Sequence, residues 1–308
     1  MKVCVVGAGG TGGLLAAVLR RAGVDVSVLA TERHVKAIKA NGLTLIAPSG
    51  RFSVQLEAEV DPRAIGACDV VVVTTKMWAI EALAPTLKPL LAEDTVVIPV
   101  QNGIDAPELL AKTLGWEHVV YGSASMNAAI EEPGVIRQKN PQYGLTVAEA
   151  QGHASPRLLK VKETFGTAGI SVEVASDGPG LLWDKFMGLV ANSSLCALLR
   201  APMGVVQKDD DCWALYTAVF NEVVAVGRAE GISLPAEKVE ARLARARTSP
   251  PMVMSSLAVD LMAGNRLELP WLGGRVRELG RKHAIPTPAS DFIWVALKPF
   301  LSGKSAAA

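Results

Sequence analysis

Residues 2–21 read KVCVV-GAGGTG-GLLAAVLRR, and this stretch decides the fold. Lys2–Val6 is a short β-branched run that predicts a buried strand, and Leu14–Arg21 has the apolar spacing of a helix that ends at Gly23. Between them lie the glycines that let a backbone approach a pyrophosphate, whose charge then meets the amides at the start of the helix. We therefore expect a nicotinamide dinucleotide to bind at Gly7, Ala8, Gly9, Gly10, Thr11 and Gly12.

The rest of the first half alternates between strand and helix patterns. Val24–Leu29 predicts a second strand, while Val70–Val73 and Thr95–Val100 are continuous apolar runs, as expected in a parallel sheet covered on both faces. Trp78–Leu91 has helical spacing and completes a strand-helix-strand unit. Residues 121–174 break into short extended pieces with one helix at Pro156–Phe165, and we interpret them as the far edge of the same sheet.

After the turn residues Asp177–Gly180, the sequence pattern changes to amphipathic or apolar helical segments, at 181–200, 210–231, 236–247, 252–263, 271–283 and 288–301. The predicted fold class is therefore α/β, with an N-terminal Rossmann-type doubly wound sheet and a C-terminal all-helical domain. We place the dinucleotide-binding domain at 1–178, the helical substrate domain at 179–303 and a disordered tail at 304–308.

Charge and cysteine content exclude several classes of protein. The 31 basic and 30 acidic residues nearly cancel, so neither nucleic acid nor an anionic membrane is an expected partner. The apolar stretch 186–206 approaches the length of a membrane span, but Asn192, Arg200 and Pro202 interrupt it and favour a buried helix. The four cysteines lie far apart with no spacing that suits a metal, and the chain starts directly with a strand pattern, so we expect no metal and a cytoplasmic protein.

The end of the second predicted strand carries conflicting signals for the cofactor. Glu32 stands about twenty residues after Gly12, where a carboxylate holds the ribose 2′-hydroxyl of NADH. Thr31, Arg33 and His34 are suited to the 2′-phosphate of NADPH instead. Each of these side chains is equally consistent with a solvated loop.

Polar residues also follow two further strands. Thr74-Thr75-Lys76 and Gln101-Asn102-Gly103 stand where ligands bind in open α/β sheets, although Asn-Gly is also a favoured turn and Lys76 an ordinary surface lysine.

In the second half, Lys185 lies in an apolar helical segment, either as a functional group or with its amine extended to solvent. Asn192 falls about 20° from it around an ideal helix and Ser193 about 80°. Ser256 and Asp260 would share a second helix face, with Glu268 beyond a Gly-Asn break.

Together these features resemble the ketopantoate reductase (2-dehydropantoate 2-reductase) family over nearly the whole chain. The resemblance is carried by GAGGTG at 7–12, TTKMW at 74–78, QNG at 101–103, YGSAS to GVIRQ at 121–138, WDKF at 183–186, SSLAVD at 255–260 and GNRLELPWL at 264–272. It implies NADPH-dependent reduction of 2-dehydropantoate to (R)-pantoate in pantothenate biosynthesis, at a site between the two domains. By resemblance Lys185 would be the general acid and Glu268 the second catalytic residue, helping Asn102 and Ser256 to hold substrate, with Lys76 near the nicotinamide and its ribose.

This chain departs from the family pattern at informative positions. Asparagines usual four and eight residues after the catalytic lysine are Leu189 and Ser193 here, and Asn192 would compensate for one of them. The usual arginine after the second strand is Thr31, for which Arg33 would substitute. NADPH is therefore the expected cofactor, with NADH as the alternative.

Two other functions compete with this hypothesis. Leu189 and Ser193 in the expected pocket favour a related dehydrogenase for another 2-oxo acid or an opine-type product. A protein that senses NAD(P) without turnover is disfavoured by Lys185 and Glu268. The apolar content of the C-terminal helices permits a homodimer without demanding one.

Overall fold

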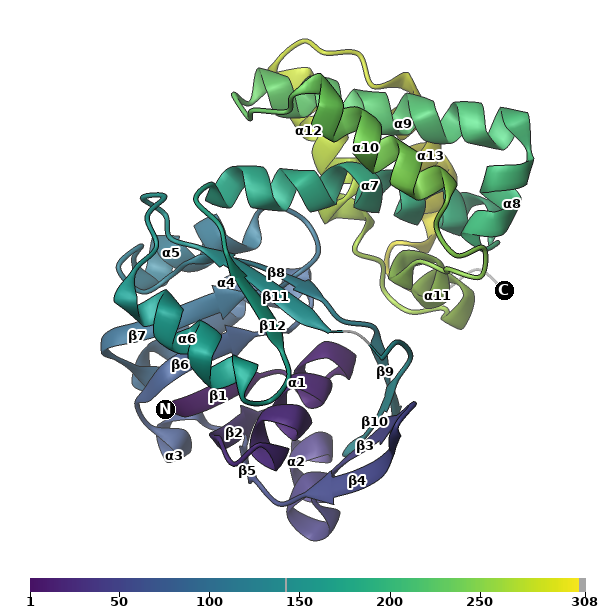
Figure 1. Cartoon of the computed structure of the whole chain (residues 1–308). Coiled ribbons are helices and arrows are strands. Elements are labelled where there is room, and N and C mark those ends of the chain that lie inside the picture. The colour runs from purple at the N-terminus through teal and green to yellow at the C-terminus, as the bar shows by residue number, and fades with distance from the viewer. Residues whose placement is uncertain (142, 305–308) are drawn as a thin grey trace. The chain divides into compact units, whose positions relative to one another are not determined.

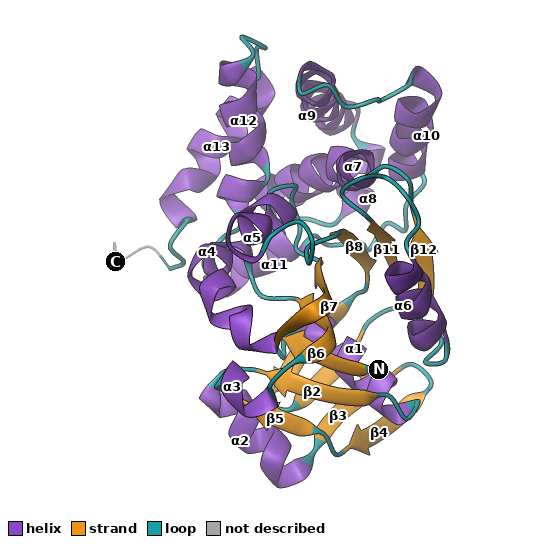
Figure 2. Ribbon diagram, turned by 90° about the vertical axis from the view of Figure 1, so that its left-hand side faces the viewer, coloured by secondary structure: helices purple, strands orange, loops and turns teal. Residues whose placement is uncertain are grey.

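The computed structural model describes residues 1–141 and 143–304 of the 308-residue chain. Its contacts divide the chain into two compact units, which are residues 1–101 with 105–181, and residues 102–104 with the chain from Leu182 onward. Figures 1 and 2 show the strands gathered in the first unit and helices in the second. The predicted fold class is confirmed. The predicted tail lies outside the described residues from position 305 on, while the Lys304 amide donates to Gly264 O.

A five-stranded parallel sheet forms the centre of the first unit. Its strand order is β5-β2-β1-β6-β7, with β1 at Lys2–Val6, β2 at Asp25–Leu29, β5 at Glu57–Glu59, β6 at Cys68–Val73 and β7 at Leu91–Pro99. The chain runs from β1 to β2 on one side and later reaches β6 on the other. The carboxyl ends of β1 and β6 therefore flank the point where the strand order reverses, which is where such sheets bind ligands.

Helices connect these strands, and one of them differs from the prediction. The helices α1 (Gly10–Arg21), α2 (Glu32–Asn41), α3 (Pro62–Ile65), α5 (Ala106–Leu114) and α6 (Pro156–Gly166) are regular. The single helix predicted over 78–91 is instead a 3₁₀ turn at Met77–Ala79, a short α4 at Ile80–Leu83 and a 3₁₀ stretch at Ala84–Leu90. Pro85 and Pro89 lack the amide hydrogens that a continuous α-helix needs there.

The prediction that residues 121–174 form the far edge of the central sheet is wrong, because they build two further sheets. One has the order β4-β3-β10-β9, and the other β12-β11-β8. Their strands are β3 (Leu43–Ala47), β4 (Gly50–Val54), β8 (Tyr121–Ser125), β9 (Ala128–Glu132), β10 (Val135–Gln138), β11 (Gly144–Ala148) and β12 (Ser171–Val174). β10 pairs with β3, about ninety residues earlier in the chain, and a local alternation pattern carries no information about so distant a partner.

The second unit is helical around its own apolar core. Its helices are α7 (Gly178–Leu199, whose first residues belong to the first unit), α8 (Met203–Lys208), α9 (Asp210–Ala229), α10 (Ala236–Arg247), α11 (Ser256–Ala263), α12 (Gly273–Lys282) and α13 (Pro288–Leu297), with 3₁₀ turns at Leu269–Trp271 and Lys298–Phe300. Phe186, Met187 and Val190 of α7 are fully buried in that core. Among the described residues, no helix combines the length and apolar character needed to cross a membrane.

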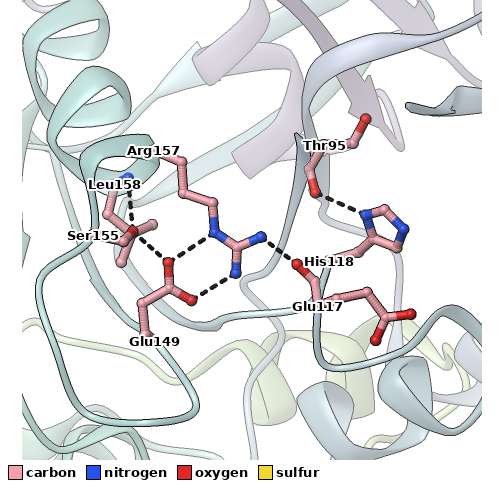
Figure 3. Close-up of polar contacts among 7 residues, drawn as sticks. All are labelled: Thr95, Glu117, His118, Glu149, Ser155, Arg157 and Leu158. Carbon is pink, nitrogen blue, oxygen red and sulfur yellow. Dashed lines mark hydrogen bonds and ion pairs between the residues drawn. The ribbon is translucent and has the colours of Figure 1, made fainter. Parts of the chain in front are cut away.

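A partly buried ion pair secures the start of α6 in the first unit (Figure 3). Arg157 donates from Nε and Nη2 to the two carboxylate oxygens of Glu149, at 2.8 and 2.6 Å, and from Nη1 to Glu117 O. Ser155 caps α6 and also donates to Glu149. Burial by itself would raise the pKa of the Glu149 carboxyl, but the hydrogen bonds from Arg157 and Ser155 outweigh it and hold the pKa below its ordinary value.

We expect Arg157→Met to lower the free energy of unfolding by about 3 kcal/mol, because it leaves the buried Glu149 carboxylate without its partner. The matched control is Arg137→Met, which breaks an exposed pair with Glu131 and should cost less than about 1 kcal/mol. Urea unfolding of both variants measures the difference. Equal losses would show that the pair around Glu149 contributes no more than a surface pair.

Candidate active site

The glycine loop is fastened at the point where the strand order reverses. Gly7 adopts a φ of 103°, which favours glycine, and its amide donates to Leu29 O at 2.8 Å. From β6, the Thr74 hydroxyl lies 3.0 Å from Val6 O and 2.9 Å from Gly7 O, and it donates to both. The end of β1 is thus tied to β2 and to β6.

The glycines of the loop serve two different purposes. A Cβ at Gly12 would stand 2.0 Å from Gly7 O, and one at Gly10 would stand 2.1 Å from Ala128 O on β9. These two glycines are needed for packing within the protein. A Cβ at Gly9 would meet no atom within 4 Å, and no side chain caps the α1 N-terminus at this residue. Gly9 is therefore where the backbone and the first amides of α1 are open to an anionic ligand.

A cavity of about 970 Å³ opens beside this loop, wholly within the first unit. This volume lies at the upper end of the roughly 300–1,000 Å³ typical of small-molecule sites. Of the residues that the sequence predicts for the cofactor, Gly7, Ala8, Gly9, Thr31 and Lys76 line the cavity. Gly10, Thr11 and Gly12 form the first turn of α1. Arg33 is exposed on α2 and is not among the described residues that line the cavity.

Residues after β6 bound the other side of the cavity. Lys76 immediately precedes the 3₁₀ turn after β6, with its Nζ 5.7 Å from the centre of the Trp78 ring. The buried Gln101 donates from Nε2 to Val73 O at 2.9 Å and to Thr75 O at 3.1 Å. Gln101 therefore holds the end of β6 in place. The next residues, Thr75 and Lys76, line the cavity.

The segment after β5 also borders the cavity, although no sequence pattern predicted a role for it. Asp61, Pro62 and Arg63 line the cavity, and the Asp61 side chain caps α3. β5 is only three residues long and reads Glu-Ala-Glu, so the sequence has no apolar run that would predict a strand here. The Asp61-Pro62 pair, an N-cap followed by proline at the first helical position, is the signal that could have found it.

In the second unit, α7 carries Lys185 on a turn that Arg242 of α10 holds. Arg242 donates from Nε to Asp184 O at 2.9 Å and from Nη2 to Asp184 Oδ2 at 2.7 Å. Burial lowers the pKa of Lys185 to about 8, and the positive charge of Arg242 contributes in the same direction. Lys185 is thus an amine whose proton is exchangeable near neutral pH.

Two turns further along α7 stand buried polar atoms without protein partners. Asn192 Oδ1 and Ser193 Oγ make no hydrogen bond to any described residue. Leaving such a group unpaired costs about 1 to 3 kcal/mol, so these atoms are suited to a polar ligand that supplies the missing hydrogen bonds.

Other predicted site residues lie on segments packed near the same helix. Burial raises the pKa of the Cys196 thiol on α7, and hydrogen bonding with Ser255, next to Ser256 at the start of α11, opposes this rise only in part. A Cβ at Gly273 would stand 3.7 Å from Ser194 Oγ, and one at Gly103 would stand 3.1 Å from Trp271 O. The segment 268–273, which begins with the buried Glu268, therefore lies close to both α7 and the turn that contains Asn102.

Comparison with known proteins assigns the family. The profile described as ketopantoate reductase PanE/ApbA matches residues 3–152, and the profile of the C-terminal part of the same family matches residues 180–300. The chain belongs to the ketopantoate reductase family. It is accordingly an oxidoreductase, which excludes a purely nucleotide-sensing role.

Similar proteins span nearly the whole chain. A 2-dehydropantoate 2-reductase of Mesorhizobium japonicum is 30% identical, with 95% of each chain covered. The crystal structure of a PanE/ApbA family ketopantoate reductase from Ralstonia eutropha is 30% identical, with a TM-score of 0.89 and coverage of 97% of this chain and 98% of that one. A D-mandelate dehydrogenase solved with NADH and anilino(oxo)acetate has a TM-score of 0.90 at 21% identity and equal coverage, and shares the fold.

The space around each glycine predicts separable effects in this ketopantoate reductase family member. Gly9→Ala should leave the urea midpoint unchanged but weaken binding of NADH or NADPH at least about tenfold, because the methyl group would project where a pyrophosphate approaches. Gly10→Ala should lower the midpoint, since its methyl group would strike Ala128 O. Urea unfolding and NADPH fluorescence titration measure the two effects. A destabilised Gly9→Ala, or one that binds NADPH normally, contradicts the assignment.

Proposed function

We propose that this protein reduces the ketone of 2-dehydropantoate to (R)-pantoate with NADPH, in pantothenate biosynthesis. The observation that carries the proposal is Lys185, an amine with a pKa of about 8 on the same helix as the unpaired polar atoms of Asn192 and Ser193. Family membership and the 2-dehydropantoate 2-reductase from Mesorhizobium japonicum support the same reaction.

The first unit fits a nicotinamide dinucleotide. Gly9 and the uncapped start of α1 would hold the pyrophosphate, Lys76 would lie toward the nicotinamide and its ribose, and Asn102 would contact both cofactor and substrate. When bound, NADPH supplies the hydride that adds to the ketone carbon.

The chain's own residues handle the proton and the orientation of the substrate. As the carbonyl carbon becomes tetrahedral, negative charge grows on its oxygen, where the Lys185 ammonium both stabilises the charge and donates a proton from Nζ. The resulting neutral amine regains a proton from solvent. Asn192, Ser193, Ser256 and Asn102 offer amide and hydroxyl groups to the substrate carboxylate and hydroxyl, and Glu268 offers a buried carboxyl group that further fixes the substrate.

A second candidate is reduction of another 2-oxo acid, including formation of an opine-type amine. Leu189, one turn after Lys185 and partly buried, presents an apolar side chain where a bulkier or less polar substrate would gain contact. The D-mandelate dehydrogenase that shares the fold was solved with a 2-oxo acid derivative carrying an aromatic group.

Steady-state kinetics discriminate the two candidates. We expect kcat/KM for 2-dehydropantoate to exceed that for pyruvate, 2-oxoisovalerate and phenylglyoxylate, each with and without an amine. Lys185→Ala should lower kcat about a hundredfold or more while NADPH binding persists. Lys238→Ala on α10, which removes an exposed amine near Asp184, is the matched control and should keep the wild-type rate. Preference for another 2-oxo acid favours the second candidate, and full activity of Lys185→Ala removes the lysine from either mechanism.

The rate of ketone reduction should depend on pH through Lys185. The ammonium is the active form, so kcat should be constant near pH 7, where about nine tenths of the lysine is protonated, and fall as the pH rises through about 8. Arg242→Gln removes the neighbouring positive charge that helps to lower the pKa of Lys185, so this pKa should rise. The descending limb should therefore move to higher pH. An unmoved limb in Arg242→Gln would assign it to another group.

A further inference from the structure

The strands β2 and β5 carry two polar segments to the same edge of the cavity. Leu29 pairs with Glu59, and the Ala30 amide donates to Glu59 O at 2.9 Å. Thr31 and Asp61 each stand two residues beyond this pair, and both line the cavity together with Arg63. In a sheet of this strand order, the adenosine half of a dinucleotide lies over the β2 side, away from β6.

At this edge Arg63 is held by its neighbour Asp61. The Asp61 carboxylate accepts from the Arg63 amide at 2.9 Å, from Nε at 3.0 Å and from Nη2 at 2.7 Å. These contacts use the Nε side of the guanidinium and leave the Nη1 edge available. The Arg63 side chain is 78% exposed, so a ligand reaches that edge without moving the backbone.

The other described titratable groups near the end of β2 either do not line the cavity or carry no charge at pH 7. Glu32 pairs with Lys36 on its own helix at 2.8 Å, and neither Glu32 nor Arg33 belongs to the described lining. His34 does line the cavity, but burial and then the charge of Arg33 lower its pKa, which keeps it neutral at pH 7. Thr31 contributes a hydroxyl that does not cap α2. Of the described cationic residues that line the cavity, Lys76 follows β6, so Arg63 is the one on the adenosine side.

We propose that Arg63 is the residue that recognises the 2′-phosphate of NADPH, with Thr31 beside it and Asp61 orienting its guanidinium. The inference rests on the proposed binding of a nicotinamide dinucleotide in this cavity. A guanidinium edge forms paired hydrogen bonds to phosphate oxygens, whereas a 2′-hydroxyl offers no charge to it. The adjacent Asp61 carboxylate repels the phosphate in part, so the preference for NADPH is moderated rather than absolute.

Nucleotide fragments test this proposal without requiring turnover. Isothermal titration should show that the wild-type protein binds adenosine 2′,5′-bisphosphate more tightly than adenosine 5′-monophosphate. Arg63→Ala, which keeps the backbone amide that Asp61 caps, should weaken binding of the bisphosphate about tenfold or more and leave the monophosphate within about twofold. Arg63→Lys should lie between the two, because an ammonium offers a point charge without the planar pair of donors.

Two further variants sharpen the test. Arg51→Ala removes an exposed arginine from β4, away from the cavity lining, and should change neither affinity. Asp61→Asn keeps a residue that caps α3 and keeps one oxygen that accepts from the Arg63 guanidinium, but it removes the negative charge that repels a phosphate. Binding of the bisphosphate should therefore tighten several-fold while that of the monophosphate stays constant.

The outcomes separate this inference from the proposed function. Equal loss of both nucleotides in Arg63→Ala, or selective loss in Arg33→Ala instead, overturns the assignment of Arg63. Selective loss in Arg63→Ala by a protein that does not reduce 2-dehydropantoate upholds Arg63 and refutes only the substrate. A wild-type protein that binds neither fragment refutes both the cavity as a dinucleotide site and the role of Arg63.

Discussion

The close approach of α1 to the end of β1 is the constraint on which the rest of the first unit depends. A side-chain carbon at Gly12 would stand 2.0 Å from Gly7 O, so only glycine lets the helix begin where it does. The Thr74 hydroxyl, which follows β6, donates to the same carbonyl and so ties β6 to the end of β1 at the point where the strand order reverses. Atoms of the protein pack closely against Gly12, so the cavity opens at Gly9 instead. A Cβ at Gly9 would meet no atom within 4 Å.

In the second unit, the long apolar helix α7 carries a few polar groups, and burying them costs free energy of folding. α7 buries Phe186 and Met187 completely, yet Lys185 stands beside them with its pKa lowered toward neutrality by burial. Asn192 and Ser193 add polar atoms that no described residue satisfies. A helix selected for stability alone would carry apolar residues at these places, and sites that break this rule are where function is expected.

The two units share the work in different ways. In the proposed function, the pyrophosphate site of the first unit comes from backbone amides at a strand end, which the parallel sheet brings to one edge. In the second, the proposed chemistry depends on individual side chains on neighbouring helices, where Arg242 holds the turn at Asp184 beside Lys185. This division explains why the Rossmann pattern is readable from a short motif, whereas the helical part requires residue-by-residue comparison.

By itself the sequence determined the order of strand, glycine loop and helix, the parallel central sheet, the helical second half, and the location of Lys185 on an apolar helix, because hydrophobic periodicity and glycine spacing are local properties. It could not determine that residues 121–174 form separate sheets, because β10 finds its partner β3 far along the chain. Nor could it show that Glu32 turns to Lys36 while Arg63 faces the cavity, since the strand β5 that brings Arg63 there has no apolar run. Such pairings depend on contacts between distant segments, and only the tertiary structure decided them.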